Sequence, residues 1–295
     1  MSELIRLSDE VHAALDESRP VVALETTIVA HGFPAPHGVE VGLEMEAAVR
    51  EAGATPATIG VLDGLIRIGL GDDELTRFDS NARKVGPRDL AACAVTGDVG
   101  ATTVGGVLAT ARMTGIRFMG TGGIGGVHRG YPSPPDVSAD LVALIQSPVL
   151  VTCSGAKSLL DIPATVEHLE TFGIPVLGYR TDTLPLFYEA TGGPAVSQRV
   201  DDPGAAARIA AAHWELGACG LLLANPPPES IEVADLIEEA VAAAAREGVS
   251  GQSVTPFVLA RLHERSQGRT REVNRKLAVA NARLAGDVSV AFSEL

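Results

Sequence analysis

Six short runs of almost wholly apolar residues recur along the chain, and most are separated by segments long enough to form a helix. The runs are rich in Val, Ile, Leu and Ala and cover residues 21–30, 58–62, 116–120, 149–153, 174–179 and 220–224. A strand that is covered on both faces is apolar along its whole length, and parallel neighbours need connections of helix length. The pattern therefore predicts an α/β fold with a mostly parallel central sheet flanked by helices, an α/β/α sandwich.

Helical periodicity fills most of the remaining chain. We expect helices at residues 39–52, 101–114, 158–172, 203–216, 229–247, 255–266 and 271–290. The last three follow one another without an intervening strand, which predicts a helical cap at the C-terminal end. No internal repeat or low-complexity linker divides the 295 residues, so we expect one catalytic α/β domain over residues 1–295.

The charge balance limits the kinds of partner. The chain has 23 Lys and Arg against 37 Asp and Glu, a formal net charge of -14. A field of that sign repels phosphate backbones and anionic lipids, which argues against nucleic-acid polymers and membranes as partners. A small phosphorylated ligand remains compatible with it, because one pocket can gather Lys, Arg and backbone N–H groups whatever the overall charge.

Cysteine usage and the N-terminal residues indicate the compartment. Cys93, Cys153 and Cys219 are widely spaced in apolar surroundings, which fits neither a disulfide framework nor a zinc site. The first 15 residues mix charged and apolar side chains, and no long apolar span follows. We therefore expect a cytoplasmic protein.

A glycine-rich run follows the predicted strand at 116–120. Gly120, Gly122 and Gly125 match the dinucleotide pattern G-x-G-x-x-G, and Asp140 lies where such folds keep an acid for the ribose. The pattern must open a helix, yet residues 127–135 contain three prolines and cannot form one. The run is better explained as a turn whose N–H groups face an anion, or as a tight turn without a ligand.

Two residues suggest covalent and acid–base chemistry. Lys157, in SGAKS, follows a predicted strand and is expected at a helix N-terminus, where the dipole and desolvation disfavour the ammonium form. Such a lysine can attack a carbonyl and form a Schiff base, although a solvated lysine is the alternative. Glu25 interrupts an apolar strand, so burial should raise its pKa towards the range of a general acid unless it emerges into solvent. His31 is either a further polar group of the site or a structural histidine.

Other polar residues are less specific. Asp136, Ser138 and Asp140 offer oxygen donors that suit Mg or Mn, but helix capping explains the same spacing more simply. Lys84 lies in a small basic cluster that is suited either to a phosphate or to solvent. Asn281 is a single amide on the last predicted helix, and alone it indicates little.

Taken together, the motifs resemble the pseudouridine-5'-phosphate glycosidase family over nearly the whole chain. In chain order they are ALETTIVAHG at 23–32, RKVGPRDL at 83–90, GATTV at 100–104, TGGIGGVHRG at 121–130, DVSADL at 136–141, SGAKS at 154–158, ANPPPE at 224–229 and TPFVLARL at 255–262. The resemblance implies reversible cleavage of the C–C bond between uracil and ribose 5-phosphate, in a homotrimer that uses a divalent ion, usually Mn²⁺.

The resemblance also implies residue roles. Lys157 would form an imine with the anomeric carbon of the ring-opened ribose, because a C-glycoside offers no leaving nitrogen or oxygen to protonate and needs an electron sink. Glu25 would serve as proton donor, and Asp136 as the metal ligand with water filling most of the shell. The implied substrate contacts are Lys84, Val104, Ser138, Ala139, Asp140 and Asn281, the last of them facing uracil.

Two small departures and two alternatives stay open. Thr26 stands where the family usually has Ser, and Gly86 and Pro87 replace a more common Ser and Arg, which puts the local geometry around Lys84 in question. A Schiff-base aldolase or lyase acting on another sugar phosphate would also keep Lys157. A nucleotide-binding protein without turnover would need only the glycine-rich run and the basic cluster.

Overall fold

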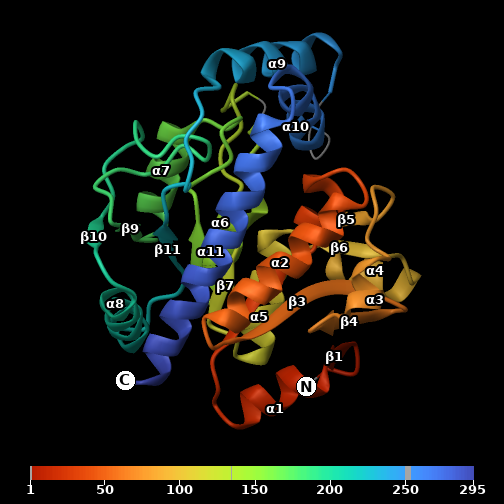
Figure 1. Ribbon diagram of the computed structural model, residues 1–295, viewed down its shortest axis with the longest axis vertical. Coiled ribbons are helices and arrows are strands. Elements are labelled where there is room, and N and C mark those ends of the chain that lie inside the picture. The colour runs from red at the N-terminus through yellow and green to blue at the C-terminus, as the bar shows by residue number, and fades with distance from the viewer. Residues whose placement is uncertain (1, 134, 250–253) are drawn as a thin grey trace.

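The computed structural model describes residues 2–133, 135–249 and 254–295. Within them one sheet of eleven strands runs through the molecule (Figure 1). The strands are β1 (Ile5–Leu7), β2 (Val21–Glu25), β3 (Thr55–Leu62), β4 (Leu65–Ile68), β5 (Arg83–Val85), β6 (Gly100–Thr102), β7 (Phe118–Gly120), β8 (Leu150–Cys153), β9 (Val176–Tyr179), β10 (Gln198–Val200) and β11 (Leu221–Ala224). Their order is β1-β4-β3-β2-β7-β8-β11-β9-β10, and β6 pairs with both β3 and β5.

The sheet is mostly parallel, as its apolar strands predict. Only the pairs β3–β4 and β3–β6 are antiparallel among the described strands. The hairpin β3–β4 closes on Asp63 and Gly64, whose φ angles are 53° and 76°. Two left-handed residues in a two-residue turn match the twist of the strands, and Asp-Gly is a favoured sequence for it. The sequence analysis did not anticipate β4, although this dipeptide signals a hairpin.

Helices cover both faces of the sheet. They are α1 (Asp9–Asp16), the π-helical turn η1 (Ile28–Gly32), α2 (His37–Glu51), α3 (Asp72–Leu75), α4 (Leu90–Thr96), α5 (Val104–Thr114), α6 (Ala139–Gln146), α7 (Ile162–Thr171), α8 (Pro203–Glu215), α9 (Ala234–Arg246), α10 (Val254–Arg265) and α11 (Arg269–Ser293). In Figure 1, α2 and α11 cross in front of the strands and α5 and α6 lie behind them. The predicted three-layer α/β/α architecture is confirmed.

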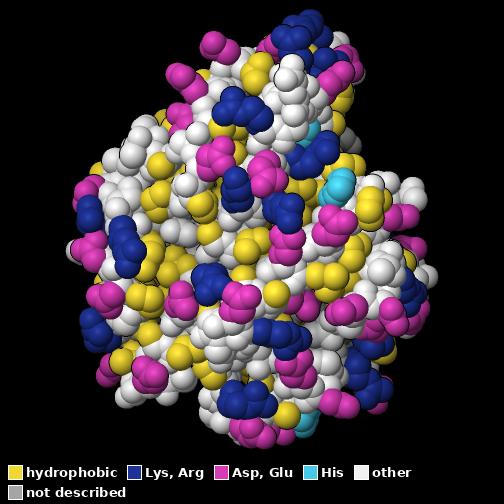
Figure 2. Space-filling model, viewed as in Figure 1, with side chains coloured by type: hydrophobic (Ala, Val, Ile, Leu, Met, Phe, Trp, Pro, Cys, Tyr) yellow, Lys and Arg dark blue, Asp and Glu magenta, His cyan; other side chains and the backbone are white. Residues whose placement is uncertain are grey.

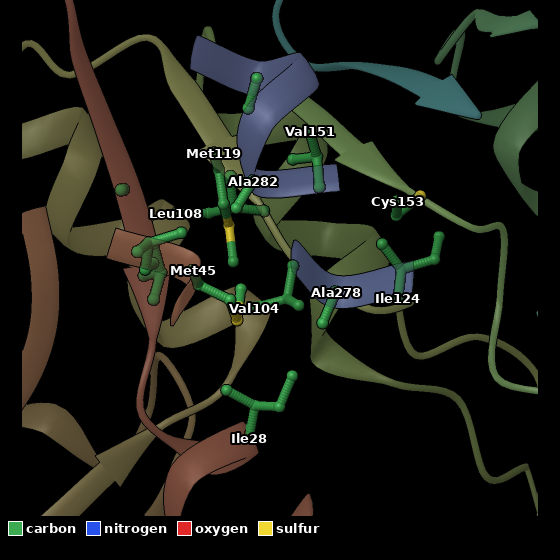
Figure 3. Close-up of a cluster of buried hydrophobic side chains, with 14 of the residues drawn as sticks. Ile28, Met45, Val104, Leu108, Met119, Ile124, Val151, Cys153, Ala278 and Ala282 are labelled. Carbon is green, nitrogen blue, oxygen red and sulfur yellow. The ribbon is translucent and has the colours of Figure 1, made fainter. Parts of the chain in front are cut away.

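The long helix α11 lies directly on the centre of the sheet. A Cβ on Gly120 of β7 would lie 2.8 Å from Cα of Ala282, so this glycine permits the close approach. Figure 3 shows the resulting core, in which Ala282 of α11, Met45 of α2 and Leu108 of α5 surround Met119 of β7. The helices α9 and α10 sit at one end of α11, and the expected succession of three C-terminal helices is confirmed (Figure 1).

Several predicted boundaries are wrong for identifiable reasons. The strand expected at 21–30 ends at Glu25, because β3 and β7 pair only up to that point and the chain then turns into η1. The helix expected from residue 101 begins at Val104, since residues 101 and 102 belong to β6 and Thr103 is the N-cap. The helix expected from residue 158 begins at Ile162, where Asp161 caps it. No helix among the described residues is long and apolar enough to span a membrane.

Candidate active site

A cavity of about 960 Å³ opens at the carboxyl ends of three neighbouring parallel strands. Glu25 is the last residue of β2, Gly122 follows β7 and Lys157 follows β8, and all three line the cavity. The turn η1, helix α10 and the start of α11 form the other walls. Crevices at the carboxyl ends of strands are the usual ligand sites of open α/β sheets.

Glu25 is buried at the inner end of this cavity, with 4% of its surface exposed. The hydroxyl of Thr27 donates a hydrogen bond to Oε2, and the hydroxyl of Thr121 donates one to Oε1. The two hydroxyls fix the carboxyl group in one orientation. The expectation that Glu25 does not emerge into solvent is therefore confirmed.

Lys157 lies in a loop, not at a helix N-terminus as predicted. The nearest following helix, α7, begins five residues later. The backbone N–H of Lys157 instead donates to the carbonyl oxygen of Ile124 at 3.0 Å. The N–H of Ile124 in turn donates to the carbonyl oxygen of Gly155 at 3.1 Å. This pairing with the glycine-rich run holds the segment extended, so no helix dipole acts on the side chain of Lys157.

Lys84, on β5, extends the cationic lining of the cavity. Burial lowers its pKa, the positive charge of Lys157 lowers it further, and the carboxylates of Asp140 and Glu25 act in the opposite direction. Neither lysine belongs to an ion pair among the described residues, and the same holds for Arg271 at the cavity wall. On the face shown in Figure 2, by contrast, basic and acidic side chains are intermingled. The cavity therefore suits an anionic ligand.

The glycine-rich run contributes backbone donors. The N–H of Thr121 donates to the carbonyl of Thr152, and that of Gly125 donates to Asp140 Oδ2 at 2.8 Å. The N–H groups of Gly122 and Gly123 have no acceptor within the described part of the chain, and both glycines line the cavity. No helix starts here until Ala139, which agrees with rejecting a dinucleotide fold.

Asp140 and Ser138 lie beside this run and not among the lining residues of the cavity. The hydroxyl of Ser138 accepts from the N–H of Asp140 at 3.2 Å and caps α6, as the simpler interpretation of the sequence predicts. The buried carboxylate of Asp140 accepts from the N–H of Gly105 at 2.7 Å as well as from Gly125. Asp140 thus ties the start of α5 to the glycine-rich run. Ala139, the first residue of α6, is exposed.

Asp136 is the more accessible carboxylate of this segment. Its side chain is 41% exposed, and Oδ2 lies 3.9 Å from Nδ1 of His128. In the ranges that the structure describes, no group of three His, Cys, Asp or Glu side chains is placed to hold a metal ion. Asp136 can therefore offer one hard oxygen ligand, with water or substrate completing the shell of a cation.

Val104 and Asn281 face inward. The side chain of Val104 belongs to the core, as Figure 3 shows, so only its backbone at the start of α5 is suited to a ligand. Asn281 is fully buried and donates to the carbonyl of Thr121 at 2.8 Å and to Ser154 Oγ at 3.1 Å, while its oxygen accepts from Asn225 at 3.0 Å. Its amide links three strand-end loops and is not part of the cavity lining.

Sequence reasoning missed a second amide on the same helix. Asn274 is 4% exposed, lines the cavity and has no hydrogen-bond partner for its side chain among the described residues. It precedes Asn281 by seven residues, which is two helical turns and places both amides on one face of α11. That spacing was the available signal. Two further cavity residues, Phe187 and His263, left no motif in the sequence.

Comparison with known proteins gives a consistent result. The family model described as "Indigoidine synthase A like protein" matches residues 10–291. A pseudouridine-5'-phosphate glycosidase from Sorangium cellulosum is 45% identical and covers 99% of this chain and 94% of its own. One from Caldanaerobacter subterraneus subsp. tengcongensis is 43% identical and covers 100% of this chain and 99% of its own.

Two solved structures share the fold over the whole chain. The prealnumycin C-glycosynthase AlnA, in complex with ribulose 5-phosphate, is 39% identical, with a TM-score of 0.91 and coverage of 100% of this chain and 98% of its own. An indigoidine synthase A-like protein from Thermotoga maritima is 35% identical, with a TM-score of 0.88 and coverage of 98% and 97%.

Proposed function

The chain belongs to the indigoidine synthase A-like family, which includes the pseudouridine-5'-phosphate glycosidases, and from this premise we propose that it is itself such an enzyme. It would cleave the C–C glycosidic bond of pseudouridine 5'-phosphate reversibly, to uracil and ribose 5-phosphate, with residues 1–295 acting as one catalytic domain. The observation that carries the proposal is the meeting of Lys157, Glu25 and Lys84 in one cavity.

The chemistry follows from these three groups. The amine of Lys157 attacks C1 of the ribose, the bond from C1 to the ring oxygen breaks, and that oxygen takes a proton from Glu25. The carboxylate of Glu25 takes a proton from the resulting ammonium, the freed nitrogen lone pair forms a C=N bond as the C–C bond to uracil breaks, and the uracil carbon takes a proton back from Glu25. Water hydrolyses the imine to ribose 5-phosphate and the free amine. Every electron pair is accounted for, with no redox partner.

Binding of the substrate needs an anion site and a base site. We assign the sugar phosphate to Lys84, which lines the cavity. The resemblance also implies substrate contacts at Val104, Ser138, Ala139 and Asp140, and of these Asp140 holds the glycine-rich run in place beside the cavity. The free N–H groups of Gly122 and Gly123 support an anionic or carbonyl group of the ligand. The edge of uracil presents donors and acceptors in alternation. We assign it to Asn274, the amide whose hydrogen-bonding groups are free to pair with it. Asn281 then supports the base site from behind.

A divalent ion, Mn²⁺ by resemblance, fits the donor set at Asp136 with water as its other ligands. When bound, it supplies positive charge for the substrate phosphate. A homotrimer is likewise proposed on resemblance, and a cytoplasmic location on the cysteine usage and the N-terminal composition. The net charge of -14 supports a small-molecule substrate over a nucleic-acid polymer or a membrane.

The direct test is chromatographic. Metal-stripped protein is incubated with pseudouridine 5'-phosphate, with and without Mn²⁺, and uracil and ribose 5-phosphate are measured. Release of both in equal amounts, increased by Mn²⁺ and abolished in Lys157→Ala, is expected. Absence of release from folded wild-type protein would reject the proposal.

A Schiff-base lyase for another sugar phosphate is the alternative that keeps Lys157. Borohydride reduction in the presence of ribose 5-phosphate should link the sugar to the wild-type chain and not to Lys157→Ala, as mass spectrometry of the intact protein detects. If the sugar phosphate is trapped on Lys157 but turnover does not depend on uracil, the alternative is favoured. A non-catalytic nucleotide-binding protein would show neither trapping nor turnover.

A further inference from the structure

Phe187 places an aromatic ring in the wall of the cavity. The residue is 4% exposed, and the little surface it keeps faces the cavity that Glu25 and Lys157 also line. Its N–H donates to the carbonyl of Ser154 at 3.0 Å, and its ring packs edge-on against Tyr188 with centroids 4.8 Å apart. The backbone hydrogen bond and the packing against Tyr188 therefore fix the position of the ring.

The backbone of Phe187 is in a conformation that bulky residues avoid. Its φ of 67° lies in the left-handed region, where a side chain larger than that of Asn or Asp costs energy. The surrounding structure must compensate for this cost. Strained residues of this kind cluster where a side chain has to be aimed at a ligand, and Phe187 is aimed at the cavity.

The glycine-rich run is shaped to receive this ring. A Cβ on Gly123 would lie 2.6 Å from Cδ2 of Phe187, so the absence of a side chain lets the ring lie flush with the backbone. A Cβ on Gly122 would lie 3.4 Å from Oδ1 of Asn274 and 3.6 Å from Cε2 of Phe187. The polar amide of Asn274 and the aromatic ring of Phe187 therefore both lie beside the backbone of Gly122 and Gly123.

We propose that Phe187 is a positioning residue for the base: the part of its ring that reaches the cavity contacts uracil edge-on, while Asn274 meets the polar edge of the base. The inference rests on the proposed function and deepens it. An edge-to-face contact with an aromatic ring stabilises a flat pyrimidine whatever its hydrogen bonds, and ribose 5-phosphate, which has no base, gains nothing. Phe187 should therefore affect uracil and leave the sugar phosphate untouched.

The test uses the synthetic direction, with uracil and ribose 5-phosphate as substrates of the full-length enzyme. In Phe187→Leu, which keeps the apolar volume but removes the ring, KM for uracil should rise by up to about tenfold, the upper range of an edge-to-face aromatic contact. KM for ribose 5-phosphate and its borohydride trapping on Lys157 should stay within twofold. Phe172→Leu, the same change at a ring outside the cavity, serves as matched control.

A second variant tests the position of the ring. Gly123→Ala should displace the ring and raise KM for uracil in the same way; because the added Cβ would also lie 3.0 Å from the carbonyl oxygen of Gly155, trapping of ribose 5-phosphate serves as the control for the loop of Lys157. An unchanged KM for uracil in Phe187→Leu, or equal losses for both substrates, would overturn the inference while leaving the proposed function intact. A wild-type enzyme that makes no pseudouridine 5'-phosphate would instead reject the function itself. Retained trapping also shows that each variant is folded.

Discussion

Burial lowers the pKa of Lys84, and the positive charge of Lys157 on the same cavity wall lowers it further. We propose different roles for the two lysines. Lys84 binds phosphate as a cation, and Lys157 reacts as an amine. The sequence analysis expected the perturbed lysine to be Lys157 at a helix N-terminus. Lys157 lies in a loop instead, five residues before α7.

The first prediction concerns pH. Because the pKa of Lys84 is lowered, its ammonium form is lost at a lower pH than that of an ordinary lysine, and phosphate affinity is lost with it. We expect KM for pseudouridine 5'-phosphate to rise as pH increases through the alkaline range. Lys84→Arg, whose guanidinium stays charged, should show a flat KM over the same range. Identical profiles for the two enzymes would contradict this role.

Substitution of the two amides of α11 should have different effects, one on stability and the other on binding of uracil. Asn281→Ala removes the shared partner of buried groups on three loops, and we expect a loss of about 3 kcal/mol in the free energy of unfolding. Asn274→Ala breaks no hydrogen bond within the described chain, so unfolding should change by no more than about 1 kcal/mol, whereas KM for uracil should rise about tenfold. Urea unfolding and initial rates measure both. The reverse pattern would return base recognition to Asn281.

A buried acid away from the cavity should make stability depend on pH. Burial raises the pKa of Glu46, which accepts a hydrogen bond from the hydroxyl of Thr58. The folded state therefore keeps its proton to a higher pH than the unfolded state, and the free energy of unfolding falls as pH rises above the usual range of a glutamate.

Substitution of this acid should remove the dependence. Glu46→Gln keeps an acceptor for Thr58 and cannot ionise, so it should be more stable than the wild type at pH 8 and within about 0.5 kcal/mol of it at pH 4. Urea unfolding at both pH values is the measurement. A variant that is less stable at pH 8 would show that the charged form is stabilised in place.

Tyr188 offers a test of an unsatisfied hydroxyl. The residue is fully buried, and its OH has no hydrogen-bond partner among the described residues. Burying such a group costs about 1–3 kcal/mol. Tyr188→Phe should therefore be as stable as the wild type or more stable by about 1 kcal/mol in urea unfolding. Tyr131→Phe, at an exposed position, should change stability by less than about 0.5 kcal/mol. A marked loss in Tyr188→Phe would indicate a bound water.

The central strands could be predicted because burial on both faces leaves a continuous apolar run, as in β8 and β11. The end of β2 at Glu25 could not, since apolar residues continue to Ala30 and only the lack of a paired neighbour stops the strand. Short edge strands such as β5 carry too few residues for a pattern.

The site was partly predictable for a similar reason. Glu25, Lys84 and Lys157 stand in motifs, and the fold brings them into one cavity. Asn274 and Phe187 stand in no motif, and their importance follows from which side chains lack partners and which face the cavity. Those are properties of packing between distant segments, so one sequence does not reveal them.

The position of α11 in the chain has a consequence for synthesis. Glu25, Lys84 and Lys157 have all left the ribosome well before Asn281, the residue that joins the loops at 121, 154 and 225. A nascent or truncated chain that ends before α11 therefore carries Lys157 without the helix whose Asn281 joins the neighbouring loops. The cavity therefore has all its walls only after α11 has left the ribosome.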